Sequence, residues 1–506
     1  MSGSLLLTVL VFSPLLGILV LSFVPRDQEK LLKLIGFLAT VPAALLSIIL
    51  FLQHQTGLDL SMFNEKRHWI SFGLFEGGEN APYSIHYELG VDGFALVMIV
   101  LTAVIAMLAA AASIHIKHDW KSYFLLFLIL ELGMLGVFAA QNLFLFFLFF
   151  EATLVPMFFL IGRWGFFERE KAAYQFLIYN GLGSAILLLV ISYLFAMTGT
   201  TNISLITQLL NTENAPLVGP ISADMKLGLS IALLAAFGIK LPIFPLHSWM
   251  VKVHAHAPPS IVMLHAGILL KIGAFGLIRF GFGFFPNEFE KMSIVLILLG
   301  LINLLYGAFL ALIQHEFKLV LAFSSISHMG IVLMGLGAMN EAGVQGAIFQ
   351  VVSHGLISAL LFFLVGIITT RTGTTNLSKL GGLASNMPYT AGFLLAGTMA
   401  SLGLPGMSGF ISEVTAFLGL FENHPELAAI GALGLILTAA YLLRATLKMT
   451  FGKEQSLHPE MSDLSWYETA PIVVLLAFIL MIGIYPASLS DSLKLTVETV
   501  IKGIGG

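Results

Sequence analysis

Long apolar segments separated by short polar stretches dominate the pattern of this chain. A bilayer core of about 30 Å is crossed by roughly 20 apolar residues of helix. Cutting the chain where charges, polar runs or Pro/Gly clusters interrupt the apolar segments predicts fourteen spans. The predicted spans cover residues 5–24, 34–52, 94–114, 123–140, 143–161, 173–197, 227–246, 260–278, 294–313, 319–339, 344–370, 389–421, 427–447 and 470–489. The pattern therefore predicts an all-α polytopic membrane protein with about 14 transmembrane helices.

Composition narrows the class of function. Hydrophobic residues make up 58% of the 506-residue chain and charged residues 10%, whereas soluble domains contain about a quarter charged residues. The net charge of -4 provides no basic surface, so we expect no nucleic-acid partner. Because the chain has no cysteine, it cannot hold a disulfide, a thiolate zinc site or a Cys-ligated iron–sulfur cluster. We expect no metal site and no cofactor in this chain, and any electron transfer must occur in other subunits.

Basic residues in the predicted loops indicate the orientation, because Lys and Arg are retained on the cytoplasmic side. One set of alternate loops holds 14 of them: Arg26, Lys30, Lys33, Lys117, Lys121, Arg163, Arg169, Lys171, Lys252, Lys318, Arg371, Lys379, Lys448 and Lys453. The other set, with both tails, holds 6: Lys66, Arg67, Lys226, Lys291, Lys494 and Lys502. This asymmetry predicts a multi-pass protein of a bacterial cell membrane with both termini on the external side.

Ionisable residues lie inside seven predicted spans, although a charge at mid-bilayer costs roughly 2.5 to 3.5 kcal/mol on insertion scales. They are Glu131, Glu151, Lys240, Lys271, Glu413, His328 and His354. One interpretation is a set of structural ion pairs between helices. Acids, amines and imidazoles spread over seven helices instead favour a path for protons or ions along the middle of the membrane.

Polar and small residues at helical spacing accompany these groups. Gln350, His354 and Ser358 share one helix face because they are four residues apart. Gly267 lies one turn before Lys271, which would leave room for water beside the amine, although a small residue also permits close helix packing. The pattern predicts a line of hydratable side chains.

Two predicted spans are interrupted by Gly and Pro. The seventh contains Gly238, Pro242 and Pro245 beside Lys240, and the twelfth contains Leu404-Pro405-Gly406 before Glu413. Interruptions at matching places in two halves indicate an inverted-repeat transporter, and simple proline kinks are the alternative. An interval of five helices makes spans 4–8 and 9–13 two inverted five-helix repeats. We therefore divide the chain into residues 1–122 (three helices and an external loop), 123–281 (first repeat), 292–450 (second repeat) and 451–506 (C-terminal helix and tail).

Four histidines near the seventh and eighth spans could suggest a metal site. They are His247, His254, His256 and His265. No carboxylate or thiolate accompanies them, and the first three fall in or beside a predicted cytoplasmic loop. We interpret them as lining a hydrated entrance.

Several strings resemble the antiporter-like subunits of respiratory complex I, over nearly the whole chain. They are LFFEATLVPM (148–157), KLP and PLHSW (240–249), HAGILLK (265–271), SSISHMG (324–330) and VSHG (352–355). Related strings occur in multi-subunit sodium/proton antiporters and membrane-bound hydrogenases. Glutamate at position 413, where most of these proteins have lysine, and GRWG at 162–165 are similar to the chain M (subunit 4) type. The chain departs from the family's usual WLPDAH, because residues 249–254 read WMVKVH.

The resemblance implies a proton-translocating membrane-arm subunit of an NADH (or other donor):quinone oxidoreductase. It implies that Glu151 pairs with Lys240, that Lys271 is the central carrier, that His328 and His354 relay protons, and that Glu413 delivers them outward. Quinone, flavin and iron–sulfur clusters are expected in partner subunits. The expected partners are the other membrane-arm subunits, including homologous antiporter-like subunits, and the lipid bilayer.

Two other functions stay open at this point. One is a subunit of a multi-subunit sodium/proton antiporter, although sodium prefers oxygen ligands and the buried set is rich in Lys and His. The other is a non-conducting scaffold of the membrane arm, in which none of these residues has to bind or release a proton.

Overall fold

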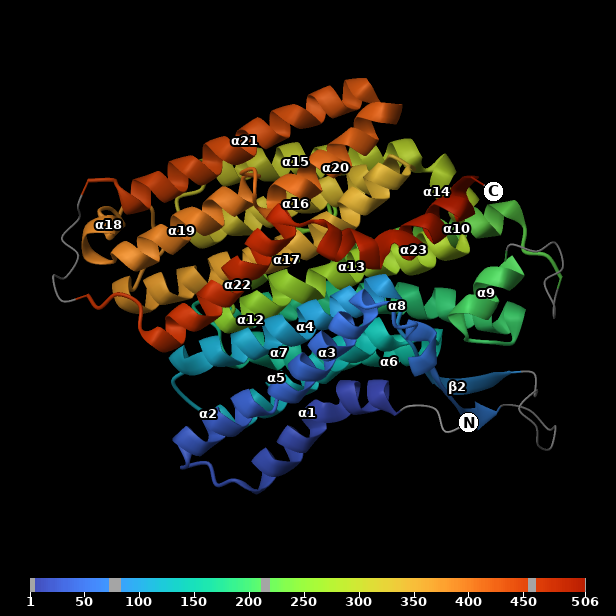
Figure 1. Cartoon of the computed structure of the whole chain (residues 1–506), viewed down its shortest axis with the longest axis horizontal. Helices are drawn as coiled ribbons and strands as arrows, with labels where there is room; N and C mark the ends of the chain where they lie inside the picture. Colours follow the sequence, from blue (N-terminus) through green and yellow to red (C-terminus); the bar gives the residue numbers. More distant parts are fainter. Residues whose placement is uncertain (1–4, 72–82, 211–218, 454–460, 506) are drawn as a thin grey trace.

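The computed structural model describes residues 5–71, 83–210, 219–453 and 461–505, and these form a bundle of roughly parallel helices (Figure 1). The first half contains α1 (Leu6–Phe23), α2 (Glu29–Leu38), α3 (Val41–Gln55), α4 (Gly93–Ala112), α5 (Trp120–Ala139), α6 (Leu143–Ala152), α7 (Leu154–Trp164), α8 (Arg169–Thr198), α9 (Ile203–Leu210), α10 (Ala223–Lys240), α11 (Ser248–His256), α12 (Pro259–Leu264) and α13 (Leu270–Gly276). Short turns in this half are the 3-10 turns η1 (Leu60–Phe63) and η2 (Ser113–His115) and the π turns η3 (His265–Leu269) and η4 (Leu277–Phe282). The second half contains α14 (Pro286–Lys291), α15 (Ser293–Ile313), α16 (Phe317–Gly337), α17 (Glu341–Thr372), α18 (Leu383–Asn386), α19 (Pro388–Ser401), α20 (Ser408–Asn423), α21 (Pro425–Thr450), α22 (Trp466–Ile484) and α23 (Ala487–Gly505). The predicted all-α membrane fold is confirmed.

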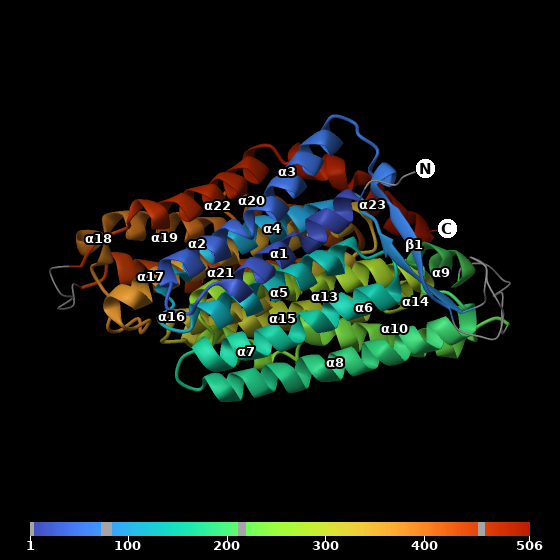
Figure 2. The same cartoon turned by 90° about the horizontal axis from the view of Figure 1, so that it is seen from below.

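Twelve helical segments of the described chain are long and apolar enough to cross a membrane. The predicted twelfth span appears as the helix pair α19/α20, interrupted where the Gly and Pro residues lie. The helix of the predicted seventh span, α10, ends at Lys240 before Pro242 and Pro245, and a further helix, α11, begins at Ser248, just beyond the predicted end of that span. Fourteen crossings are compatible with this arrangement. Figures 1 and 2 show that α1 begins and α23 ends at the same end of the bundle, as an even number of crossings requires.

Two elements lie wholly inside the bundle: α17, and the continuous helix from α12 to η4. Glycines bring them together, because a Cβ on Gly355 would lie 2.8 Å from the carbonyl oxygen of Gly267. Such contacts between small residues let helices approach closely in a membrane. The space that the sequence suggested for water at Gly267 is therefore taken by helix packing, and that interpretation was wrong.

The stretch between the second and third predicted spans, which the sequence analysis treated as a loop, contains two paired β-strands. Strand β1 (Glu65–Ser71) pairs antiparallel with β2 (Ser84–Leu89), with Glu65 opposite Leu89. The carboxylate of Glu65 accepts a hydrogen bond of 2.9 Å from the backbone of Leu7 at the start of α1, where free N–H groups favour an acid. The paired strands therefore tie the first helix to one end of the bundle.

A short sequence occurs twice, after α8 and after α17: Thr-Gly-Thr-Thr-Asn at 198–202 and at 372–376. Both glycines are left-handed, with φ of +70° at Gly199 and +72° at Gly373. The two copies are followed by α9 and α18, which lie at opposite ends of the bundle (Figure 1). Equivalent turns at opposite ends agree with inverted repeats, and the division into domains stays a prediction.

Candidate functional site

Lys271 lies at the centre of the bundle on α13, with none of its surface exposed. Its Nζ donates a hydrogen bond of 2.7 Å to the carbonyl oxygen of Ala266 and lies 2.6 Å from Nδ1 of His354 on α17. The π turn η3 directly precedes α13, and such turns occur often at functional sites. An amine, a carbonyl and an imidazole in contact can exchange a proton between Lys271 and His354.

The contacts continue from His354 to His328 on α16 and to Glu413 on α20. The two imidazole centroids are 5.3 Å apart, and His328 Nδ1 lies 3.6 Å from Glu413 Oε1. Gln350 Nε2 lies 3.1 Å from the same Nδ1, and Ser401 Oγ lies 3.3 Å from Nε2 of His328. We call Lys271, His354, His328 and Glu413 the central polar chain, and the structure brings these four predicted residues together.

A small void of about 10 Å³ lies beside this chain, bounded among others by His328, Gln350, His354 and Glu413. A second void of about 10 Å³ adjoins His354 together with Ser324, Ser325 and Ser358. A polar space of this size is at the lower limit for one water molecule. The side chains of the predicted stripe, Gln350, His354 and Ser358, thus line the two voids, each of which has about the volume of one water molecule.

Lys240 ends α10, and its side chain is buried at 2% exposure. Its ammonium lies 4.6 Å from the ring centre of Phe150 and 5.9 Å from that of Phe176, which supplies cation–π attraction. The neighbouring Glu151 on α6 is close enough to interact electrostatically with Lys240, but no ion pair within 4.0 Å joins them in the described structure. One Glu151 oxygen is buried without a hydrogen-bond partner among the described residues.

A histidine pair that the sequence analysis placed at an entrance lies instead inside the bundle. His254 on α11 and His265 on η3 are fully buried, and Nε2 of His254 lies 2.9 Å from Nδ1 of His265. The ring of Phe176 lies between the pair and Lys240, with its centre 6.1 Å from that of His265 and 5.9 Å from the Lys240 ammonium. The pair therefore extends the polar line from Lys240 toward the central polar chain, and its assignment to a cytoplasmic mouth was wrong.

The signal for this pair was present in the sequence, because α11 buries Trp249, Met250, Val253 and His254 at helical spacing.

Glu131 lies fully buried on α5, and neither of its carboxylate oxygens has a hydrogen-bond partner within the described ranges.

Both helix breaks lie next to charged members of the site. In the first break, Asn303 of α15 accepts a 2.7 Å hydrogen bond from the backbone of Phe244 and donates one of 3.2 Å to the carbonyl oxygen of Pro242. In the second, Gly403 has φ of +78°, and a Cβ there would lie 2.5 Å from Oε2 of Glu413. Glycine thus permits the left-handed turn and leaves room for the carboxylate against the backbone.

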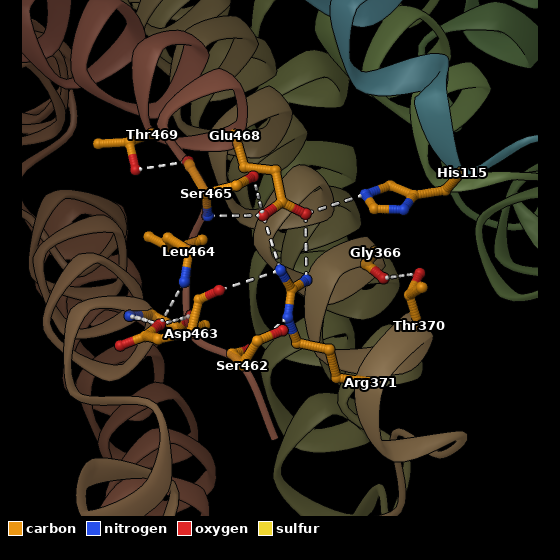
Figure 3. A network of polar contacts seen from close by, with 11 residues as sticks. His115, Gly366, Thr370, Arg371, Ser462, Asp463, Leu464, Ser465, Glu468 and Thr469 are labelled. Carbon is orange, nitrogen blue, oxygen red and sulfur yellow. Dashed lines mark hydrogen bonds and ion pairs between the residues drawn. The ribbon is translucent and has the colours of Figure 1, made fainter. Parts of the chain in front are cut away.

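A further ion cluster joins three elements, η2, α17 and α22 (Figure 3). Arg371 of α17 donates to both oxygens of Glu468 on α22, at 3.1 and 2.7 Å, and Nε2 of His115 lies 3.3 Å from Oε1. The Glu468 side chain is 1% exposed and also accepts from Ser465 in a capping box. The sequence analysis did not predict this cluster. We interpret its role as structural, because it holds α22 against α17.

Comparison with known proteins identifies the family of this chain. The model of the family described as NADH:quinone oxidoreductase/Mrp antiporter, TM, matches residues 140–438. The chain belongs to this family. Members include NADH-quinone oxidoreductase subunit M of Rhodobacter capsulatus, 36% identical over 98% of this chain and 96% of the relative. NAD(P)H-quinone oxidoreductase chain 4 2 of Thermosynechococcus vestitus is 37% identical over 99% of this chain and 92% of the relative.

A solved structure has the same architecture. A chain of respiratory complex I from Thermus thermophilus superposes with a TM-score of 0.85 at 27% identity, covering 99% of this chain and 100% of that chain. The resemblance to the chain M (subunit 4) type is therefore confirmed. All the predicted site residues except Glu151 lie within α10 to α20, and Glu151 also falls inside the matched family region.

Proposed function

We propose that this family member is a proton-translocating membrane-arm subunit of an NADH (or other donor):quinone oxidoreductase. The observation that carries the proposal is the contact between Lys271 and His354 and its continuation through His328 to Glu413. Amine, imidazole and carboxyl groups each bind and release protons, and here they succeed one another across the interior of the bundle. The related subunit M and chain 4 proteins, by their names, belong to quinone oxidoreductases.

The chain acts as the proton-carrying part, and the redox chemistry belongs to its partners. Without cysteine it has no ligands for a Cys-bound iron–sulfur cluster, so quinone, flavin and iron–sulfur clusters are assigned to partner subunits. Those partners include homologous antiporter-like subunits of the membrane arm. Both termini face outward, and the membrane is the bacterial cell membrane.

The proposed role of Glu151 is electrostatic switching of Lys240. A carboxylate near a buried amine strengthens its hold on a proton, and separation weakens it. In the described structure the two groups interact without a direct ion pair, so a small movement of either side chain changes that interaction. Moving one charge against 100 mV takes about 2.3 kcal/mol, which is within the range of a change in one buried charge interaction. Lys240, the His254/His265 pair and the central polar chain then pass the proton toward Glu413, which releases it outward.

The test is substitution of Lys271 by Met, which keeps the length of the side chain and removes the amine. In inverted membrane vesicles in sodium-free medium, Lys271→Met is expected to lower proton uptake and quinone reduction together while the complex stays assembled. Lys291→Met, at an exposed site outside the central polar chain, is the matched control and should behave as wild type. Wild-type proton uptake in assembled Lys271→Met would support the scaffold function. Loss of activity in sodium-free medium by the wild-type complex itself would support sodium transport.

A further inference from the structure

A groove of about 530 Å³ lies between α2, α4, α5 and α22, with η2 at one end. We call it the α2–α22 groove. Its lining is apolar along most of its length, and Leu108, Phe124 and Val474 are among its residues. A groove of this kind on the outside of a membrane bundle does not fill with water, because its walls offer few hydrogen-bond partners.

Four lining residues of the groove carry polar side-chain atoms, and they form what we call its mouth: Lys33, Trp120, Trp466 and Tyr467. Lys33 of α2 points its ammonium at the face of Trp120, 4.1 Å from the ring centre. Trp466 and Tyr467, at the start of α22, are 82% and 48% exposed. These residues lie in the first turns of α2, α5 and α22, and Trp and Tyr at helix ends mark the depth of lipid head groups.

The charge of Lys33 has no counter-ion in the described part of the chain, because no carboxylate there lies within 4.0 Å of it. The nearby Lys121 differs, since its ammonium donates to the carbonyl oxygens of Ser22 and Val24. Cytoplasmic basic pockets between transmembrane helices are a known type of site for anionic lipid head groups. The ammonium of Lys33, held beside Trp120 without a carboxylate partner, therefore favours the binding of an anion at the mouth of the groove.

The dimensions of the groove fit a hydrocarbon chain below such an anion. From Trp466 to Val474 the lining of α22 descends eight residues, which is roughly 12 Å at 1.5 Å per residue. Half of the bilayer core is about 15 Å thick, so an acyl chain that starts at head-group depth runs along most of this length.

We propose that the α2–α22 groove binds one anionic phospholipid, with its phosphodiester beside Lys33 and an acyl chain along Leu108, Phe124 and Val474. Lys33, Trp120 and the exposed aromatics of α22 recognise the head group and its depth. The site is separate from the central polar chain and does not depend on the proposed transport function.

The experiment uses the intact complex, extracted in detergent, stripped of exchangeable lipid and offered equal amounts of deuterated phosphatidylglycerol and phosphatidylcholine. Retained lipid is measured by mass spectrometry. Wild type should retain phosphatidylglycerol in preference to phosphatidylcholine. Lys33→Gln should lose the phosphatidylglycerol that belongs to this groove, and Ala470→Phe should lose it as well, because the exposed Ala470 lines the groove and a larger side chain would fill it. Lys30→Gln, an exposed lysine on the same helix that does not line the groove, is the matched control and should retain it.

A photoreactive residue in place of Tyr467 identifies the occupant in native membranes. Adducts with phospholipid support the proposal. Adducts with a neighbouring subunit alone would overturn it, because a protein helix would then fill the groove. Equal phosphatidylglycerol retention in wild type, Lys33→Gln and Ala470→Phe would also overturn it, and equal retention of the two lipids by wild type would overturn recognition of the anion.

Discussion

At the scale of single residues, Glu413 is buried at 6% exposure beside His328, and its Oε1 has no hydrogen-bond partner among the described residues. A buried carboxylate in this setting is costly unless it exchanges a proton or is hydrated. On the other side of the carboxylate, Oε2 lies so close to the backbone of Gly403 that any side chain at position 403 would collide with it. The residue therefore lies in close surroundings at the end of the central polar chain.

The first prediction follows from this position. Glu413→Gln keeps the shape of the side chain and removes its proton exchange, so proton uptake by inverted vesicles and quinone reduction should fall together. Glu413→Lys, which installs the commoner residue of the resembling proteins, should retain part of both rates. Wild-type rates and an unchanged ratio in Glu413→Gln, with the complex assembled, would remove this residue from the path.

At the scale of elements, the break between α10 and α11 is held by a side chain from another helix. Asn303 of α15 bonds two backbone groups within the interruption, the N–H of Phe244 and the carbonyl oxygen of Pro242. The sequence contains the Gly and Pro residues that prevent a continuous helix, but the amide that satisfies the freed backbone groups comes from about 60 residues away.

The second prediction concerns this amide. Asn303→Ala removes two hydrogen bonds, each worth about 1 kcal/mol net, and should lower the thermal stability of the complex and the proton-pumping rate. Asn303→Asp keeps the acceptor for Phe244 and should retain more stability than Ala. A matched control is Asn423→Ala, whose amide bonds the carbonyl oxygen of Ala338 away from the break. If both Ala variants lower proton pumping equally, the loss does not come specifically from the break that Asn303 bonds, and this prediction is wrong.

At the scale of the whole molecule, α1 begins and α23 ends at one end of the bundle, and the basic residues of the loops predict that this end is external. The absence of cysteine makes the orientation directly measurable, because each introduced thiol is the only one in the chain. Met62 near η1 and Lys379 after α17 are exposed and lie in loops of opposite predicted side.

The third prediction is that a membrane-impermeant thiol reagent applied to intact cells labels Met62→Cys and not Lys379→Cys. In inverted vesicles the pattern should reverse, and a permeant reagent should label both variants in either preparation. Labelling of Lys379→Cys from outside intact cells, with Met62→Cys protected, would show that the orientation is the opposite one.

The sequence by itself determined the all-α membrane character, the two interruptions and the six ionisable residues of the candidate site that lie within apolar segments, because apolar length, Pro/Gly chemistry and the cost of a charge in the membrane are local properties. It could not determine which of these residues touch. The contact of Lys271 with His354 joins positions 83 residues apart. The apolar windows of α17 and of the α12–η4 helix are buried on all sides, so the contrast of a buried and an exposed face does not show which side meets which neighbour. Only the tertiary structure placed the His254/His265 pair in the interior, filled the space at Gly267 with Gly355, and left Glu151 near Lys240 without a direct ion pair. The physical reason is that these outcomes depend on how distant helices pack, and small residues and helix breaks permit several packings that the chain alone does not distinguish.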